Sequence, residues 1–230
     1  MKTVGIIGGM SWESTQHYYT VMNRIVSDRM GRHNSLESII YSVNFERILD
    51  FVDRGEWDPV GEIIASLAKK LQTAGADILI LASNAIHKVF ARVEAAVEIP
   101  VIHIVDPTAE AIQNAGIGKI GLLGTQVTMQ ESFYKDRLQD RYGIETIIPE
   151  EKDREAIHKI IFEELTVGKI HDASRQKLMA IVEKLAKRGA GGVILGCTEL
   201  TLLIGQKTAA VPFFDTTDLH AKAAVELAIS

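Results

Sequence analysis

The single cysteine of this 230-residue chain, Cys197, stands where a thiol can do chemistry. It ends the apolar run "GGVILGC" and is followed by Thr198 and Glu199 instead of further apolar residues. A cysteine in such a run is often only a buried core residue, and that interpretation stays open. A thiol between a strand end and a helix N-terminus, however, has its pKa lowered from about 8.5 toward neutrality. We therefore expect Cys197 to exchange protons with a substrate, and one cysteine alone rules out an internal disulfide.

A second polar turn follows the apolar run in "ILILASNAIHKVF", residues 78–90. Ser83 and Asn84 stand at its end, Ala85 comes next, and His87 follows Asn84 by three residues. Residues three apart share one helical turn, so Asn84 and His87 can face the same ligand. Alternatively, Asn84 caps a helix and His87 is an incidental surface residue. The seven histidines show no H-E-x-x-H or similar pairing, and we expect no metal site.

An internal repeat places these two turns over one another. The segments "KLQTAGADILILASNA" (70–85) and "KLAKRGAGGVILGCTE" (184–199) align at an offset of 114, which sets Ser83 over Cys197. "VGIIGGM" aligns with "IGLLGTQ" at an offset of 116, and "IPVIHIVDPTAEA" aligns with "VPFFDTTDLHAKA" at 112. One such pair is a coincidence that segments rich in Gly, Ala and Leu readily produce. Three pairs in the same order indicate two similar lobes of roughly 110 residues.

Short runs of Ile, Val and Leu alternate with longer helical patterns, which is typical of βαβ units and buried parallel sheets. Helical patterns such as "EIIASLAKKLQTAG" carry apolar residues three and four apart and end at a glycine. The fold class is therefore α/β with mainly parallel sheets. The predicted strands cover residues 3–9, 35–44, 76–83, 100–105, 119–125, 144–149, 191–197 and 210–215.

Ligands of open parallel sheets bind beyond the carboxyl ends of the strands, and further candidate residues stand there. If the strand ends of the two lobes face one another, the serine turn and the cysteine turn border a shared cleft. The turn "GIIGGM" ends at Met10, and Thr125 occupies the equivalent turn of the second half. Neither is a nucleotide-binding motif, but backbone N–H groups there favour a carboxylate. Arg47 and Arg54 either grip a substrate carboxylate or belong to a solvated helix face.

The composition excludes several classes of function. The chain is 47% hydrophobic and 24% charged, as in ordinary globular proteins, and its net charge is −5. Lys and Arg are scattered along the sequence, so nucleic acid is not an expected partner. No apolar run approaches the ~18 residues of a membrane span, and the first residues lack the apolar region of a signal peptide. We expect a cytoplasmic protein that binds a small molecule and no membrane.

Several motifs together resemble the aspartate/glutamate racemase family of cofactor-independent amino-acid racemases. They cover essentially the whole chain: "GIIGGMSWEST", "RGEWDP", the turn at 83–87, "IIFEELTVGK", "ILGCTEL" and "PFFDTTDLHAKAAV". The resemblance implies two pseudo-symmetric α/β/α lobes, residues 1–102 plus 210–230 and residues 103–209. It also implies an active site in the cleft between the lobes, an amino-acid substrate, no cofactor, and commonly a homodimer.

In that family a cysteine from each lobe flanks the substrate Cα. One is the thiolate base and the other the acid, because inversion needs proton transfer on opposite faces. The resemblance gives these roles to Cys197 and to position 83, and it implies that Asn84 and Thr198 stabilise the carbanion beside the α-carboxylate. The other substrate-binding positions that it implies are Met10, Val52, Arg54, Ala85, Thr125, Thr166 and Glu199.

This sequence departs from the family pattern at three positions. Ser83 stands in place of the first cysteine; some family members carry a hydroxyl residue there, and an introduced substitution fits as well. Ala85 replaces a threonine that is often found there. Thr166 stands where some aspartate-specific relatives have a lysine, which argues against strict aspartate specificity.

We therefore expect an asymmetric racemase for aspartate- or glutamate-type substrates, with Cys197 as its stronger acid/base and Ser83 as its weaker one. Two alternatives stay open. One is a single-thiol decarboxylase or isomerase of the same superfamily, and the other is a relative that binds dicarboxylates without catalysis.

Overall fold

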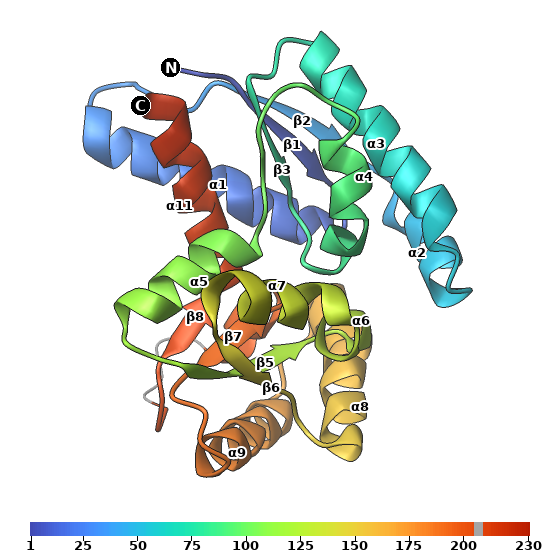
Figure 1. Cartoon of the computed structure of the whole chain (residues 1–230), viewed down its shortest axis with the longest axis vertical. Coiled ribbons are helices and arrows are strands. Elements are labelled where there is room, and N and C mark those ends of the chain that lie inside the picture. Colours follow the sequence, from blue (N-terminus) through green and yellow to red (C-terminus); the bar gives the residue numbers. More distant parts are fainter. Residues whose placement is uncertain (205–208) are drawn as a thin grey trace. The chain divides into compact units, whose positions relative to one another are not determined.

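The computed structural model describes residues 1–204 and 209–230, and it divides into two compact units (Figure 1). Unit 1 comprises Met1–Ile104 and His220–Ser230, and unit 2 comprises Val105–Leu219. The chain therefore passes from unit 1 to unit 2 after Ile104 and returns after Leu219. No helix in the described parts of the chain has the length and apolar character that crossing a membrane requires.

Each unit contains a four-stranded parallel sheet, with strand order β2-β1-β3-β4 in unit 1 and β6-β5-β7-β8 in unit 2. The first sheet consists of β1 (Val4–Gly8), β2 (Ser38–Ser42), β3 (Ile78–Leu81) and β4 (Val101–Ile102). The second consists of β5 (Lys119–Gly124), β6 (Glu145–Ile147), β7 (Val193–Gly196) and β8 (Phe213–Asp215). The α/β prediction is confirmed, and each predicted strand is present in a shorter form.

The register of the sheets matches the internal repeat. Gly5 pairs with Leu79 in the first sheet, and Gly121 pairs with Val193 in the second. These are the same pairing displaced by 116 and 114 residues, the offsets of the sequence alignment. The segments after β3 and β7 therefore leave equivalent strands of two matching sheets.

In unit 1, alternate strand residues enter cores on opposite faces of the sheet, as the pleat requires. Ile6 and Ile80 pack with helices on one face, and Ile7 and Leu81 pack with helices on the other. The first face is covered by α1 (Trp12–Met30) and α11 (Thr216–Ile229). The second is covered by α2 (Phe45–Asp53), α3 (Trp57–Thr73), η1 (Ala85–Val89) and α4 (Phe90–Glu94).

In unit 2, Leu123 and Leu195 enter a core formed with α8 (Glu151–Lys159), the π-helix η2 (Ile160–Glu164) and α9 (Asp172–Lys187). The 3-10 helix η3 (Leu165–Val167) and α10 (Leu200–Ile204) contribute to the same core. Unit 2 also contains α5 (Val105–Asn114), α6 (Gln126–Gln130) and α7 (Ser132–Tyr142).

The helix after the last strand of each sheet packs in the other unit. After β4, α5 packs against α7 in unit 2, and after β8, α11 from His220 onward packs against α1 in unit 1. The family resemblance predicts that residues 210–230 belong to the first lobe. The structure instead places 210–219 in unit 2, because β8 pairs with β7 and belongs to the second sheet.

Tyr18 and Tyr134 are fully buried at equivalent positions of the repeat, but their hydroxyls differ in hydrogen bonding. The Tyr18 hydroxyl lies 2.9 Å from His220 Nδ1, and His220 Nε2 lies 3.0 Å from the Ile102 carbonyl oxygen. A carbonyl only accepts, so Nε2 donates, and in the neutral ring Nδ1 accepts from Tyr18. Burial raises the pKa of Tyr134, a rise that the Thr108 hydroxyl opposes. Its hydroxyl has no hydrogen-bond partner of good geometry among the described residues.

This difference predicts unequal effects of removing the two hydroxyls. Tyr18→Phe is expected to lower the free energy of unfolding by about 1–3 kcal/mol, because a buried ring nitrogen loses its donor. Tyr134→Phe removes a hydroxyl that satisfies no such group, and we expect a change below about 0.5 kcal/mol. Urea unfolding followed by circular dichroism measures both variants. Equal losses of stability in the two would contradict this account of the pair.

Candidate active site

Cys197 directly follows β7, and α10 begins three residues later. Its half-buried side chain packs against the core of unit 2. The thiol donates a hydrogen bond to Glu199 Oε2, with Sγ and Oε2 2.9 Å apart. Glu199 is itself buried, with 7% of its surface exposed. The turn after β7 therefore holds a thiol and a carboxylate in direct contact.

This environment raises the pKa of the Cys197 thiol well above its usual value. Burial is the largest cause, the negative charge of Glu199 is the second, and the hydrogen bond to its carboxylate is the third. The backbone N–H of Glu199 opposes the rise, as a helix N-terminus would, but it is the weakest of these effects. The sequence-based expectation of a lowered pKa was therefore wrong, because burial and a nearby carboxylate outweigh the backbone donor. At neutral pH the group is a thiol.

A raised thiol pKa predicts a steep pH dependence for alkylation of the protein. Only the thiolate reacts, so the rate with iodoacetamide should rise about tenfold per pH unit from pH 7 to 9 without a plateau. Since Cys197 is the only cysteine, total incorporation reports on this position alone. Labelling quenched at a series of times, followed by intact-mass measurement, gives the alkylation rate at each pH. A plateau below pH 8 would contradict the raised pKa.

Hydroxyl groups tie the end of β8 to the end of β7. Thr198 Oγ1 lies 3.1 Å from Thr217 Oγ1, and the Thr216 hydroxyl donates to the Leu195 carbonyl oxygen at 2.9 Å. Thr216 and Thr217 are fully buried. The sequence pattern predicted a role for Thr198 but not for these two, although the run "TTD" (216–218) directly after the predicted strand 210–215 was a usable signal.

The other two threonines proposed in unit 2 use their hydroxyls locally. Thr125 caps α6, accepting a hydrogen bond from the Thr128 backbone N–H at 3.4 Å. Thr166 lies in η3 and donates to the Phe162 carbonyl oxygen at 2.9 Å. Both hydroxyls are therefore engaged by nearby backbone groups.

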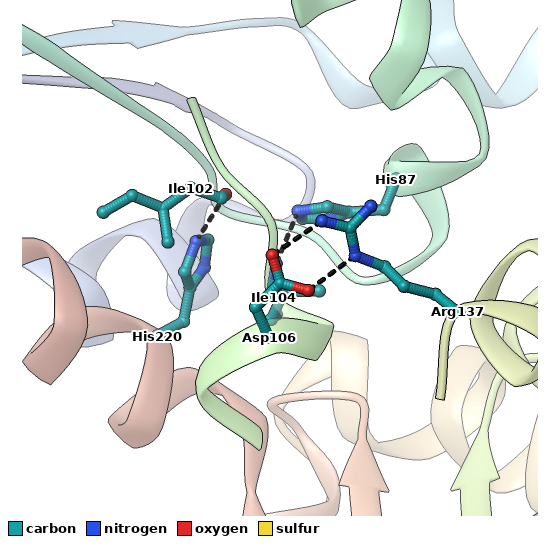
Figure 2. A network of polar contacts seen from close by, with 6 residues as sticks. All are labelled: His87, Ile102, Ile104, Asp106, Arg137 and His220. Atoms are coloured by element: carbon teal, nitrogen blue, oxygen red, sulfur yellow. Dashed lines mark hydrogen bonds and ion pairs between the residues drawn. The ribbon is translucent and has the colours of Figure 1, made fainter. Parts of the chain in front are cut away.

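In unit 1, a buried histidine fixes the turn that carries Ser83. His87 Nδ1 lies 2.8 Å from the Ser83 carbonyl oxygen. Figure 2 shows the contact of the opposite ring nitrogen: His87 Nε2 accepts from the Ile104 backbone N–H at 3.1 Å. A carbonyl only accepts and an N–H only donates, so the ring is neutral with its proton on Nδ1. His87 is 2% exposed and stacks on Phe90. The interpretation of His87 as an incidental surface residue was wrong.

The residues between Ser83 and His87 depart from the expected cap. Asn84 is buried and precedes η1 in a helical backbone conformation, and its side chain makes no capping hydrogen bond. Ala85, the first residue of η1, is half-buried. The capping interpretation of Asn84 was therefore wrong, since a residue already in the helical region is not placed to cap.

The turn after β1 approaches the end of β2 closely. Gly9 has φ +87°, and a Cβ there would lie 2.4 Å from the Val43 carbonyl oxygen, so only glycine fits. The next residue, Met10, is buried in the same core cluster that Val52 packs against. Arg54 is more than half exposed, and its Nη2 bonds Glu56 Oε2 at 3.1 Å. Met10 and Val52 thus share a core. Arg54 lies on the surface, as in the alternative that places it on a solvated helix face.

The crossover at Ile104 is anchored on both of its sides (Figure 2). Within unit 1, His220 bonds the Ile102 carbonyl and His87 bonds the Ile104 N–H. Within unit 2, the Arg137 guanidinium donates twice to the Asp106 carboxylate at 2.6 Å, a bidentate pair between half-buried side chains. One of these anchors, His87, is also the residue that holds the Ser83 carbonyl.

The fold and these turns define a class of protein: a duplicated α/β chain with a hydroxyl after β3 and a thiol after the equivalent strand β7. A family model described as Asp/Glu/hydantoin racemase matches residues 7–224. The chain belongs to this Asp/Glu/hydantoin racemase family.

Individual relatives agree with the family. The crystal structure of a candidate Asp/Glu racemase from Yersinia pestis is 44% identical, with a TM-score of 0.94 and full coverage of both chains. An aspartate racemase homologue from Pyrococcus horikoshii OT3 is 37% identical with a TM-score of 0.87, again over both whole chains. The broad specificity amino-acid racemase RacX of Bacillus subtilis is 25% identical over 96% of each chain.

Proposed function

We propose that this protein is a cofactor-independent racemase of aspartate- or glutamate-type amino acids, with Cys197 and Ser83 exchanging the proton at Cα. The observation that carries the proposal is the equivalence of the two residues. Each follows the strand that pairs with the first strand of its sheet, in the same register. Two-base inversion needs a base on one face of the α-carbon and an acid on the other, and a duplicated fold supplies two equivalent turns.

The two groups have unequal strength, and the proposed reaction is asymmetric for that reason. In one direction Cys197, as thiolate, takes the α-proton, and Ser83 or a water that it orients returns a proton to the opposite face. In the other direction a serine hydroxyl must serve as the base, and it is a far weaker one than a thiolate. We therefore propose that the direction in which Cys197 is the base dominates. Asn84 and Thr198 are the proposed donors for the charge that develops on the α-carboxylate.

We propose a broad substrate range within acidic amino acids, instead of strict specificity for aspartate. The Thr166 hydroxyl donates to the Phe162 carbonyl oxygen in the preceding π-helix η2, and a threonine brings no positive charge to a distal carboxylate. The broad specificity amino-acid racemase RacX, 25% identical to this chain, supports the same view. As working expectations we also propose a homodimer and the absence of a cofactor.

Proton exchange in deuterated buffer tests the proposed function. Each enantiomer of aspartate and glutamate is incubated with the protein, and loss of the α-proton is followed by NMR. We expect exchange from at least one acid, with one enantiomer reacting faster than the other. An absence of exchange from all four compounds would reject the proposal.

A single-thiol decarboxylase is the second candidate, and the protonated state of Cys197 favours it. A thiol with a raised pKa stays protonated at neutral pH, so its proton is available to a carbanion formed by loss of CO2. Such a reaction needs no second acid/base, so Ser83 would suffice as it is. Turnover of a disubstituted malonate, with no exchange of aspartate or glutamate protons, would favour this candidate. Binding of dicarboxylates without either reaction would indicate a non-catalytic relative.

A further inference from the structure

The carboxylate of Glu199 needs a role other than binding the carboxylates of the proposed substrates. Its carboxylate is buried and accepts the proton of the Cys197 thiol in a hydrogen bond of 2.9 Å. An acidic substrate brings two carboxylates of its own, and like charges repel strongly in a desolvated site. Glu199 is therefore poorly suited to grip either carboxylate of the proposed substrates.

The protonated thiol of Cys197 also needs a route by which it becomes a base. A base that takes an α-proton must first lose its own, yet the surroundings of Cys197 keep the thiol protonated. A residue that receives this proton needs to lie within hydrogen-bond reach of Sγ when the transfer takes place. Glu199 Oε2 meets that condition in the structure, with no rearrangement of the turn.

We propose that Glu199 is the positioning residue that takes the Cys197 proton, so that the working base is a Cys197–Glu199 pair. The S–H bond breaks, its electron pair stays on sulfur, and the proton forms an O–H bond with Glu199 Oε2. The thiolate then takes the α-proton of the substrate, which regenerates the S–H bond. No oxidation or reduction is involved. Negative charge leaves the carboxylate as it forms on sulfur, so the turn never holds two negative charges at once.

This inference rests on the proposed function for its kinetic consequence but not for its chemical one. Replacing Glu199 with glutamine removes the negative charge while keeping an acceptor of similar size. The Cys197 thiolate then becomes easier to form, and alkylation by iodoacetamide at pH 7.5 should be faster by about tenfold, corresponding to one pKa unit. If Glu199 also accepts the proton during turnover, kcat for α-proton exchange should fall by about 10²-fold, with KM changed less than about threefold.

The opposite movement of the two rates is what a merely structural role cannot produce. Glu199→Asp keeps the charge with a shorter reach, and we expect slow alkylation as in the unmodified protein and partial recovery of exchange. Glu183→Gln, an identical change at an exposed position of α9, is the matched control and should leave both rates unchanged. Circular dichroism and thermal melting establish that each variant is folded. If Glu199→Gln does not fold, the pH profiles of alkylation for Glu199→Asp and the unmodified protein decide instead.

Several results would overturn the inference. Unchanged or slower alkylation in Glu199→Gln means that the carboxylate does not control the thiol proton. Faster alkylation with undiminished exchange means that another group takes the proton in turnover. If the unmodified protein exchanges no substrate proton, the proposed function fails, yet the alkylation comparison still decides whether Glu199 holds the thiol proton.

Discussion

Cys197→Ala is expected to abolish α-proton exchange in both directions, with a loss of about 10²–10⁴-fold for each enantiomer. The proposal gives Cys197 a role whichever enantiomer is bound, as base in one direction and as acid in the other. Ser83 alone cannot replace it, because a serine hydroxyl is neither a strong acid nor a resting base at neutral pH. The chain contains no second thiol that could substitute.

Two controls separate loss of chemistry from loss of structure. Cys197 is half-buried and close to alanine in size, so the variant should melt within a few degrees of the unmodified protein. It should also still bind aspartate or glutamate in a calorimetric titration. Cys197→Ser places a hydroxyl after both β3 and β7, and we expect it to be as inactive as the alanine variant. Exchange above one-tenth of the original rate, in the alanine variant, would remove Cys197 from the mechanism.

Much of the fold could be predicted from the sequence because its signals are local. Buried parallel strands appear as short runs of Ile, Val and Leu, and the eight runs found in this way correspond to the strands of two sheets. The duplication extended this to topology, since equal offsets between segments predict equal strand order. The matching pairs Gly5–Leu79 and Gly121–Val193 show that the alignment even carried the register.

The chemical state of the candidate site was less predictable because it depends on distant packing. Its position near a helix N-terminus predicts a lowered pKa for Cys197, but α10 is short and the side chain packs against the core cluster of unit 2, whose residues come from several distant elements. The hydrogen bond from the thiol to Glu199 depends on side-chain conformation that two-residue spacing does not dictate.

Two further differences arise from contacts that are remote in the sequence. His87 is buried because η1 packs on the sheet, which brings the histidine ring within 4.7 Å of the His103 ring and 5.8 Å of the His220 ring, centroid to centroid. The second crossover follows Leu219 because β8 first completes the second sheet. Local hydrophobic patterns do not report either arrangement.

Ser83→Cys is expected to raise α-proton exchange by about 10–10²-fold and to reduce the difference between the two enantiomers. A cysteine pKa of about 8.5 is several units below that of an alcohol, so a thiol at this position is a better acid and a better base. The substitution changes one atom of a half-buried side chain, and the His87 contact to the backbone carbonyl of residue 83 does not involve that atom. The largest gain should occur for the enantiomer that reacts more slowly with Ser83.

The matched controls are Ser83→Ala and Ser66→Cys. The first removes the hydroxyl and should lower the residual exchange, which would show that the Ser83 hydroxyl takes part in proton transfer. The second adds a thiol on the exposed surface of α3 and should leave exchange unchanged. All measurements are made under reducing conditions so that no new disulfide forms. If Ser83→Cys binds aspartate with unchanged affinity and still exchanges no proton, the two turns do not act on one carbon, and the protein is better described as a dicarboxylate-binding member of its family.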